Sequence, residues 1–203
     1  MMNQARVLTL PGWHGSDDRH WQSRWENLYG YRRVEQHDWQ RPLRGDWSAR
    51  LEEEILAGQG MPTVLVAHSL GCALVAAWAR HSRHARLVRA ALLVAPPDTE
   101  TESLRQQLQG WAPLERQRLP FICTVIASSD DPYCTPARGR AFAADWGAAF
   151  VDVGPHGHLN SDSQLGDWPQ GHAYLREAAG AAAVALVPAP TSTVSPARPT
   201  SSN

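Results

Sequence analysis

The sequence contains no lysine, so all 19 of its basic residues are arginines. Schiff-base chemistry and a lysine nucleophile are therefore excluded. Cysteine is also scarce: Cys72, Cys123 and Cys134 are odd in number and form no Cys-x-x-Cys pair. We expect neither a disulfide framework nor a cysteine-rich zinc site, and this usage fits a reducing compartment.

Neither sign of charge dominates, and long apolar runs are missing. The 20 acidic and 19 basic residues give a formal charge of −1, with neither sign gathered into a block. Charge therefore predicts no binding to nucleic acid or to an anionic membrane. The apolar stretch before Pro11 is too short for a secretory signal or a membrane span, so we expect a cytoplasmic protein.

What the sequence does contain is enough apolar residues for one core, 43% of 203. Short apolar runs alternate with amphipathic stretches, which predicts βαβ units in a minimal α/β fold, with a mostly parallel sheet of about six strands between helices. The predicted strands are 6–10, 62–67, 90–95, 121–127 and 149–153, with a weaker edge strand at 31–39. The predicted helices are 18–28, 47–56, 70–83, 101–108, 136–146 and 169–179.

The composition changes after about Gly180. Residues 181–203 are rich in Pro, Ser, Thr and Ala and nearly free of charge, apart from a short VALV run. We therefore predict one domain over residues 1–180 and a disordered tail over 181–203, to which we assign no function.

The sharpest local pattern is VLVAHSLGCALVAAWAR at 64–80, an apolar strand followed by a tight turn and an apolar helix. This pattern is typical of a nucleophile elbow, in which Ser69 occupies a strained turn above the sheet. Gly71 satisfies the later small position, and Ala67 stands where a glycine is usual. The alternative is a buried strand and helix in which Ser69 merely caps the helix.

A serine hydroxyl needs a base and a group that orients the base. In the architecture built around a nucleophile elbow, the three groups follow strands in the order serine, acid, histidine along the chain. Asp130 and Asp131 follow the predicted strand 121–127, and His156 and His158 follow 149–153. Spacing leaves open which member of each pair acts. A His-x-His metal fragment is the alternative, but no further ligands are suitably placed, so we predict no metal and no organic cofactor.

The sequence resembles the small α/β-hydrolase-fold serine hydrolases typified by retinoblastoma-binding protein 9 and its bacterial relatives. The resemblance spans roughly residues 5–180 and rests on four blocks. They are LPGWHGSDDRHWQSRW at 10–25, AHSLGC at 67–72, SSDDPYC at 128–134 and GHLNSDSQLGDWPQG at 157–171. It implies an α/β-hydrolase fold, and it selects Ser69, Asp131 and His158 as the catalytic residues.

The oxyanion of such an enzyme needs two backbone donors. We expect the N–H of Leu70, directly after the serine, and that of Trp13, in the loop after the first strand. Gly12, His14 and His68 are the candidate substrate-binding residues beside them. Trp21 and Trp25 follow at helical spacing, and we interpret them as core residues rather than substrate contacts.

These patterns favour a serine hydrolase that cleaves small carboxylic esters, or alternatively amides or thioesters, through an acyl-enzyme. Only about 25 residues separate the strands predicted at 90–95 and 121–127, which leaves no room for a large cap domain at that crossover. The partner is then a small acyl substrate, and the sequence does not identify a protein partner. The alternative function is a non-catalytic protein-binding module on a hydrolase scaffold.

Overall fold

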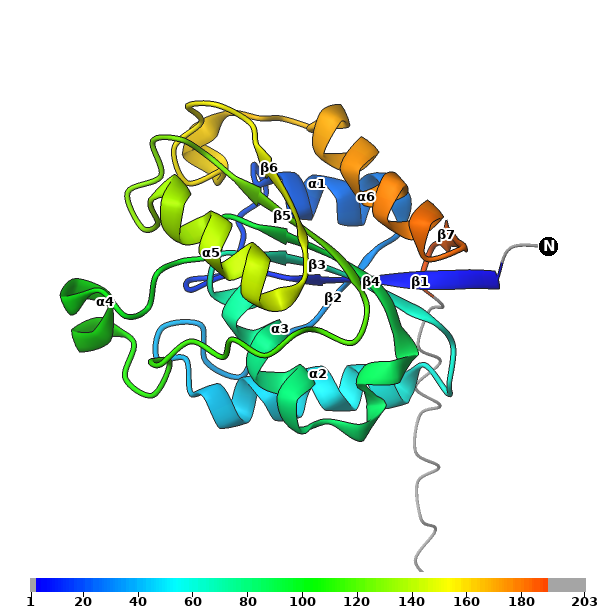
Figure 1. The fold of residues 1–203 in the computed structure, drawn as a ribbon. Coiled ribbons are helices and arrows are strands. Elements are labelled where there is room, and N and C mark those ends of the chain that lie inside the picture. The colour runs from blue at the N-terminus through cyan, green and yellow to red at the C-terminus, as the bar shows by residue number, and fades with distance from the viewer. Residues whose placement is uncertain (1–2, 190–203) are drawn as a thin grey trace, which may run out of the picture.

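The computed structural model describes residues 3–189 as one parallel sheet covered by helices on both faces (Figure 1). The strands are β1 (Asn3–Leu10), β2 (Arg32–Arg33), β3 (Thr63–His68), β4 (Val88–Val94), β5 (Ile122–Ala127), β6 (Ala149–Asp152) and β7 (Val184–Val187). Their order is β2-β1-β3-β4-β5-β6, and β7 pairs with the first half of β1. After β1 the chain forms β2 on one side of β1 and then β3 on the other side, so the strand order reverses between β1 and β3. Open α/β sheets bind their ligands at the carboxyl ends of the strands beside such a reversal.

Two layers of helices enclose this sheet. The helices are α1 (Trp21–Tyr29), α2 (Arg44–Ala57), α3 (Leu70–His81), α4 (Glu102–Gln107), α5 (Pro136–Trp146) and α6 (Pro169–Ala181), with short 3-10 helices at Arg83–Leu87 and Ser161–Ser163. One apolar cluster joins α2, α3 and α5 to one face of the sheet, and a second joins α1 and α6 to the other. This arrangement confirms the predicted α/β fold. The connection between β4 and β5 contains α4 alone, and no large cap covers the sheet.

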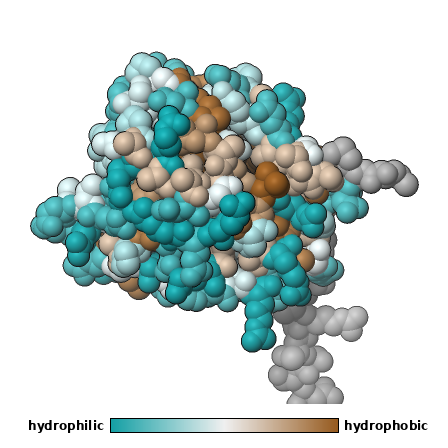
Figure 2. All heavy atoms as spheres, in the orientation of Figure 1, coloured by the Kyte–Doolittle hydropathy of each residue, from teal (hydrophilic) through white to brown (hydrophobic). Residues whose placement is uncertain are grey.

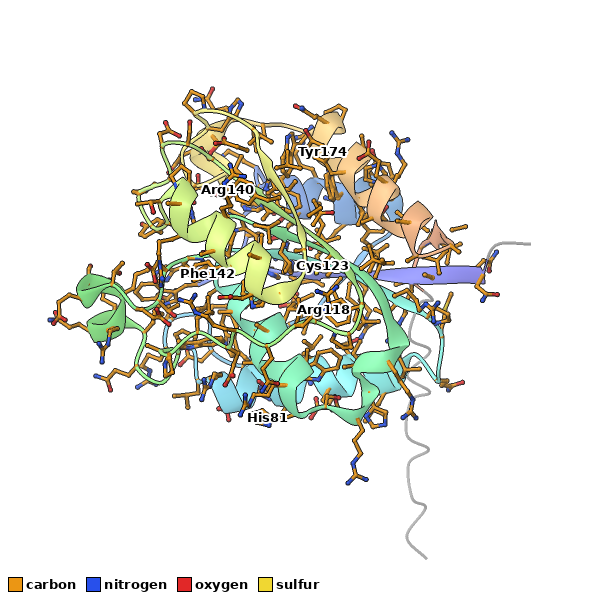
Figure 3. The ribbon with its side chains drawn as sticks, in the orientation of Figure 1. His81, Arg118, Cys123, Arg140, Phe142 and Tyr174 are labelled. Carbon is orange, nitrogen blue, oxygen red and sulfur yellow. The ribbon has the colours of Figure 1, made fainter. Side chains whose placement is uncertain are left out.

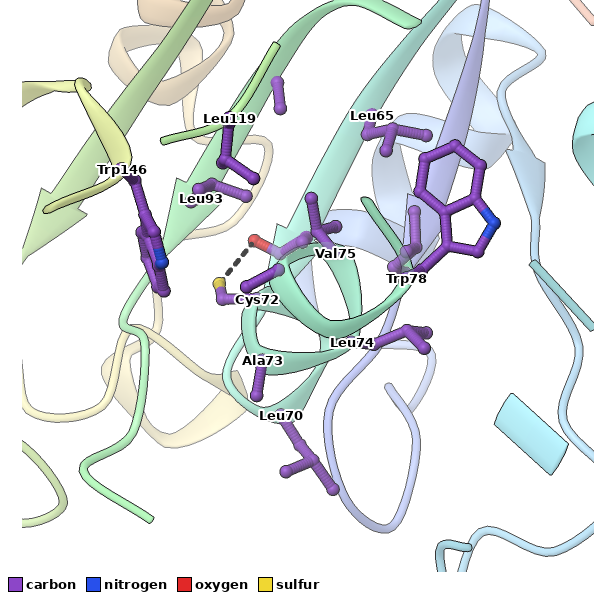
Figure 4. Packing of buried hydrophobic residues seen from close by; sticks show 14 of the residues in the cluster. Leu65, Leu70, Cys72, Ala73, Leu74, Val75, Trp78, Leu93, Leu119 and Trp146 are labelled. Atoms are coloured by element: carbon purple, nitrogen blue, oxygen red, sulfur yellow. Dashed lines mark hydrogen bonds between the residues drawn. The ribbon is translucent and has the colours of Figure 1, made fainter. Parts of the chain in front are cut away.

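The central strands are apolar throughout because both of their faces are covered. All six residues of β3 are buried. Figure 4 shows the start of α3 packed against this strand, where the Cys72 thiol faces the carbonyl oxygen of Ala67 at 3.6 Å. Burial raises the pKa of Cys72 well above its usual value, so this cysteine acts as a small core residue.

Turn chemistry sets the bounds of α5. Pro136 occupies its first turn, where the missing N–H is harmless, and Thr135 caps the N-terminus. Gly147 ends the helix in a left-handed conformation at φ 69°. Figure 3 shows Phe142 and Arg140 on this helix; Phe142 is fully buried, and the Arg140 guanidinium lies over the Phe150 ring.

The structure differs from the sequence predictions near the C-terminal end of the domain and at one edge of the sheet. The expected strand over 31–39 shortens to β2. Strand β7 lies past the expected domain boundary at residue 180. It belongs to the sheet, because its four residues pair with Asn3–Arg6 of β1. The remainder of the predicted tail, residues 190–203, lies outside the described residues.

The surface in Figure 2 is hydrophilic over α4, whereas apolar residues gather in a band between α5 and α6, where β6 forms an edge of the sheet. Within residues 3–189, none of the helices combines the length and the apolar character that crossing a membrane requires.

Candidate active site

Ser69 lies in the turn between β3 and α3, at φ 52° and ψ −124°. A non-glycine residue at positive φ is strained and must be held by its surroundings. The Ser69 N–H donates to the carbonyl of Val94 at 2.9 Å. Gly71 makes the close approach possible, because a Cβ there would lie 2.3 Å from the carbonyl oxygen of Leu10. The turn therefore has the geometry of a nucleophile elbow.

Three side chains from distant segments form a continuous hydrogen-bonded chain. The Oγ of Ser69 lies 2.8 Å from Nε2 of His158. The Nδ1 of His158 lies 2.9 and 3.0 Å from the two carboxylate oxygens of Asp131. The side chains of His158 and Asp131 are 10% and 2% exposed. Because a carboxylate accepts, Nδ1 carries the proton and Nε2 is free to accept from the Ser69 hydroxyl.

The neighbouring candidates Asp130 and His156 are placed differently. The Asp130 carboxylate accepts from the hydroxyl of Ser128 at 2.8 Å and from the N–H of Gly157 at 2.7 Å. The Ser128 hydrogen bond lowers the pKa of Asp130. The backbone N–H of His156 donates to the same Ser128 hydroxyl. Both residues thus organise the loop before His158, and neither hydrogen-bonds to Ser69.

The backbone donors that we expect for an oxyanion are the N–H groups of Leu70 and Trp13. Within residues 3–189, the N–H groups of Leu70 and Trp13 donate to no other protein atom. Leu70 begins α3, where N–H groups have no partner inside the helix. Gly12 lies directly against Ser69, since a Cβ at this position would be 2.7 Å from the Cβ of Ser69. Gly12 therefore lets the loop approach Ser69 but offers no side chain to a substrate.

A cleft of about 330 Å³ opens above Ser69. His14 lines it and is held through Nδ1 by the side chain of Gln40. His68 also lines it but is 4% exposed, and its Nε2 lies 2.9 Å from the carbonyl oxygen of His158. That donor is therefore engaged within the protein and is not free for a substrate.

Sequence reasoning missed part of this lining. The residues concerned are Asp17, His20, Tyr133, Asn160, Ser161 and Asp162. The sequence signal that could have found two of them is their closeness to predicted site residues, since Tyr133 is two residues after Asp131 and Asn160 is two after His158. Tyr133 stands edge-on to the His158 ring at 4.6 Å. Trp21 and Trp25 are buried, as predicted.

Potential metal ligands do not gather in the part of the chain that the structure describes, where no three His, Cys, Asp or Glu side chains are arranged to hold an ion. The thiols are all buried. Burial raises the pKa of Cys123 to about 11 and that of Cys134 to about 12. These thiols therefore remain protonated at neutral pH and are poor nucleophiles.

Comparisons with known proteins identify the family of this chain. A serine hydrolase family model matches residues 7–177. No curated protein sequence matches the chain. A YdeN-like hydrolase from Pectobacterium atrosepticum is 26% identical, with a TM-score of 0.77 over 89% of this chain and 93% of that one.

Two more distant structures share the fold. The ydeN gene product of Bacillus subtilis is 19% identical, with a TM-score of 0.68 over 87% of this chain and all of that one. A thermophilic esterase from Thermogutta terrifontis is 15% identical, with a TM-score of 0.61 over 90% and 92% of the two chains. The family match covers most of the chain and confirms the expected family, so this chain belongs to the serine hydrolases of the α/β-hydrolase superfamily.

Proposed function

We propose that this hydrolase cleaves small carboxylic esters with a catalytic triad of Ser69, His158 and Asp131. The observation that carries the proposal is the unbroken chain of hydrogen bonds from Ser69 Oγ through His158 to the buried Asp131 carboxylate. A serine hydroxyl is a weak nucleophile until a base accepts its proton, and this arrangement supplies both the base and the group that orients it.

The reaction proceeds in two halves. Ser69 Oγ forms a bond to the ester carbonyl carbon while His158 Nε2 accepts the hydroxyl proton. The bond between the carbonyl carbon and the ester oxygen then breaks, and the imidazolium gives its proton to the departing alkoxide. The alcohol leaves, and the acyl group remains on Ser69. Water then attacks the acyl group with His158 again as the base, which releases the acid and restores Ser69. Asp131 fixes the imidazole tautomer and stabilises its positive charge in both halves.

The negative oxygen of the tetrahedral intermediates takes hydrogen bonds from the N–H groups of Leu70 and Trp13. Among residues 3–189, no acceptor competes for these donors, which supports this role. The cleft of about 330 Å³ supports a short acyl chain as substrate.

Replacing the nucleophile tests the proposal directly. We expect Ser69→Ala to lower kcat for p-nitrophenyl acetate by about 10⁶-fold, because no other group can form the acyl intermediate. Circular dichroism shows whether the variant is folded. Hydrolysis by folded Ser69→Ala at the wild-type rate would contradict the mechanism, and no hydrolysis by either protein would favour a binding role.

Asp130 provides a matched control for the proposed role of Asp131 as the acid of the triad. We expect Asp131→Asn to lower kcat by about 10⁴-fold, because the amide no longer holds the required tautomer of His158. Asp130→Asn keeps an acceptor oxygen for Ser128 and Gly157, so its loss should be far smaller. Equal losses in the two variants would show that Asp131 has no special role.

A further inference from the structure

The loop that carries His158, residues 154–160, is fastened to the core by two buried side chains. The carbonyl oxygen of His158 lies 2.9 Å from Nε2 of His68, and that of Leu159 lies 2.8 Å from Nε1 of Trp21. His68 ends β3 and Trp21 begins α1, so the donors come from separate elements. Two consecutive carbonyls of the loop are thus bound from inside the protein.

The donors themselves have little freedom to move. His68 is 4% exposed and Trp21 is 1% exposed, and their rings stand edge to face at 6.1 Å. Leu159 is fully buried at φ 50°, a conformation that a leucine adopts only where its surroundings enforce it. The bond from Trp21 to the Leu159 carbonyl is one such constraint.

The His68 contact also joins the nucleophile to the base by a short path. The backbone of His68 leads directly into Ser69, while its side chain holds the backbone of His158. Since a carbonyl oxygen can only accept, Nε2 of His68 carries the proton. Burial keeps the pKa of His68 well below its usual value, so the ring stays neutral 5.0 Å from the His158 ring and does not oppose the positive charge that His158 acquires.

We propose that His68 and Trp21 are positioning residues, which hold the loop of His158 so that its Nε2 stays within hydrogen-bond distance of Ser69 Oγ. This inference rests on the proposed function and assigns His68 a different role from substrate binding. A displacement of about 1 Å at a catalytic group can lower a rate about 10²-fold, so loss of either donor should act on the chemical step.

Trp25 provides a matched control for Trp21. It lies one turn further along α1, is also fully buried, and donates through Nε1 to the carbonyl of Asp167 at 2.7 Å. Trp21→Phe and Trp25→Phe therefore each remove one hydrogen bond from an indole N–H to a backbone carbonyl, and they reduce the side-chain volume equally. We expect similar losses of thermal stability, but only Trp21→Phe should lower kcat for p-nitrophenyl acetate, by about 10- to 100-fold with little change in KM. Equal kcat values in the two variants would overturn the proposal.

The His68 contact is tested by two substitutions of similar length. His68→Gln can donate from nearly the same place, whereas His68→Met cannot. We expect Gln to keep kcat within a few-fold of wild type and Met to lower it about 10- to 100-fold at nearly unchanged KM. A raised KM with unchanged kcat in His68→Met would instead indicate substrate binding and overturn the proposal. This pair also decides the question if Trp21→Phe does not fold.

The failure of this inference is distinguishable from the failure of the proposed function. Labelling of wild type by a fluorophosphonate probe, lost in Ser69→Ala, establishes the reactive serine independently of the loop. If Ser69 is labelled, and both Trp21→Phe and His68→Met are labelled at the wild-type rate, then the positioning role is wrong while the nucleophile stands. If wild type and Ser69→Ala are equally unlabelled, the proposed function fails first and the positioning role falls with it.

Discussion

At His20, burial changes the acid–base chemistry of a single side chain. Its Nδ1 accepts from the N–H of Gln22 and so caps α1, while Nε2 has no partner among the described residues. The residue is 3% exposed, and this burial lowers its pKa to about 3, with only partial compensation from Asp17. The folded protein therefore keeps this imidazole neutral.

This neutral histidine makes stability depend on pH. The unfolded chain takes up a proton at His20 below about pH 6.5, whereas the folded chain does not until about pH 3. The free energy of unfolding therefore falls as the pH decreases through this range, by up to about 1.4 kcal/mol per pH unit for one such group. Urea unfolding at pH 7, 6 and 5 measures this slope.

His20→Asn is the informative variant, because asparagine keeps an acceptor for the helix N-terminus and does not titrate. We expect its stability to fall less steeply below pH 6.5 than that of wild type. An identical slope in the two proteins would show that His20 takes up its proton equally in the folded and unfolded states.

The sequence predicts a serine, an acid and a histidine in that order, each after a different strand. In the structure, Ser69 hydrogen-bonds to His158, and His158 hydrogen-bonds to Asp131. Spacing did not separate Asp131 from Asp130, because both follow the same strand. The difference is one of direction: Asp131 faces His158, and Asp130 turns to the N–H of Gly157.

Among the elements, the junction of β1, β3 and α3 positions Ser69. Gly71 is the contact point, and the atom that a Cβ would strike belongs to the backbone of Leu10 in a central strand. A strand carbonyl cannot rotate away as a flexible side chain can. The helix therefore approaches the strand closely enough to support the elbow only because residue 71 has no side chain.

We expect Gly71→Ala to lower the free energy of unfolding by about 1–3 kcal/mol or more, through this overpacking. Gly45 in α2 is the control, since a Cβ there would meet nothing within 4 Å. Gly45→Ala should be neutral or stabilising by up to about 1 kcal/mol, because alanine is the better helix former. Chemical denaturation compares the two, and equal effects of the same sign would contradict this account of the elbow.

Most elements were predictable because buried strands and amphipathic helices have distinct apolar patterns. The sequence does not predict strand β7, because the composition around its VALV run indicates a tail. Its partner is the polar start of β1, where Asn3 and Gln4 are exposed and give no strand signal of their own. Only the pairing of the two segments, 180 residues apart, makes both into strands.

For the whole molecule, the open architecture determines what reaches Ser69. The connection from β4 to β5 carries only the six-residue helix α4, and within residues 3–189 no large cap domain covers the cleft. The lining from Asn160, Ser161 and Asp162 arises where the loop after β6 meets the loop after β1, as the bond from Ser161 to Asp17 shows. No local sequence pattern indicates that two distant loops will meet, so the sequence does not predict that these residues line the cleft.

An uncapped cleft of about 330 Å³ should select for short acyl chains. We expect kcat/KM for p-nitrophenyl esters to be highest for acetate or butyrate and to fall steadily toward palmitate. Ser69→Ala measured in parallel corrects for spontaneous hydrolysis. A clear preference for the longest chains would mean that the protein holds an acyl site larger than this cleft.

The central claim is that Ser69 is a nucleophile activated by His158 and Asp131. Mass spectrometry of the protein after reaction with a fluorophosphonate tests it most directly. We expect one adduct per chain, located on Ser69 by peptide mapping, absent from Ser69→Ala and formed far more slowly by His158→Ala. An adduct on another residue, or equal labelling of wild type and His158→Ala, would contradict it.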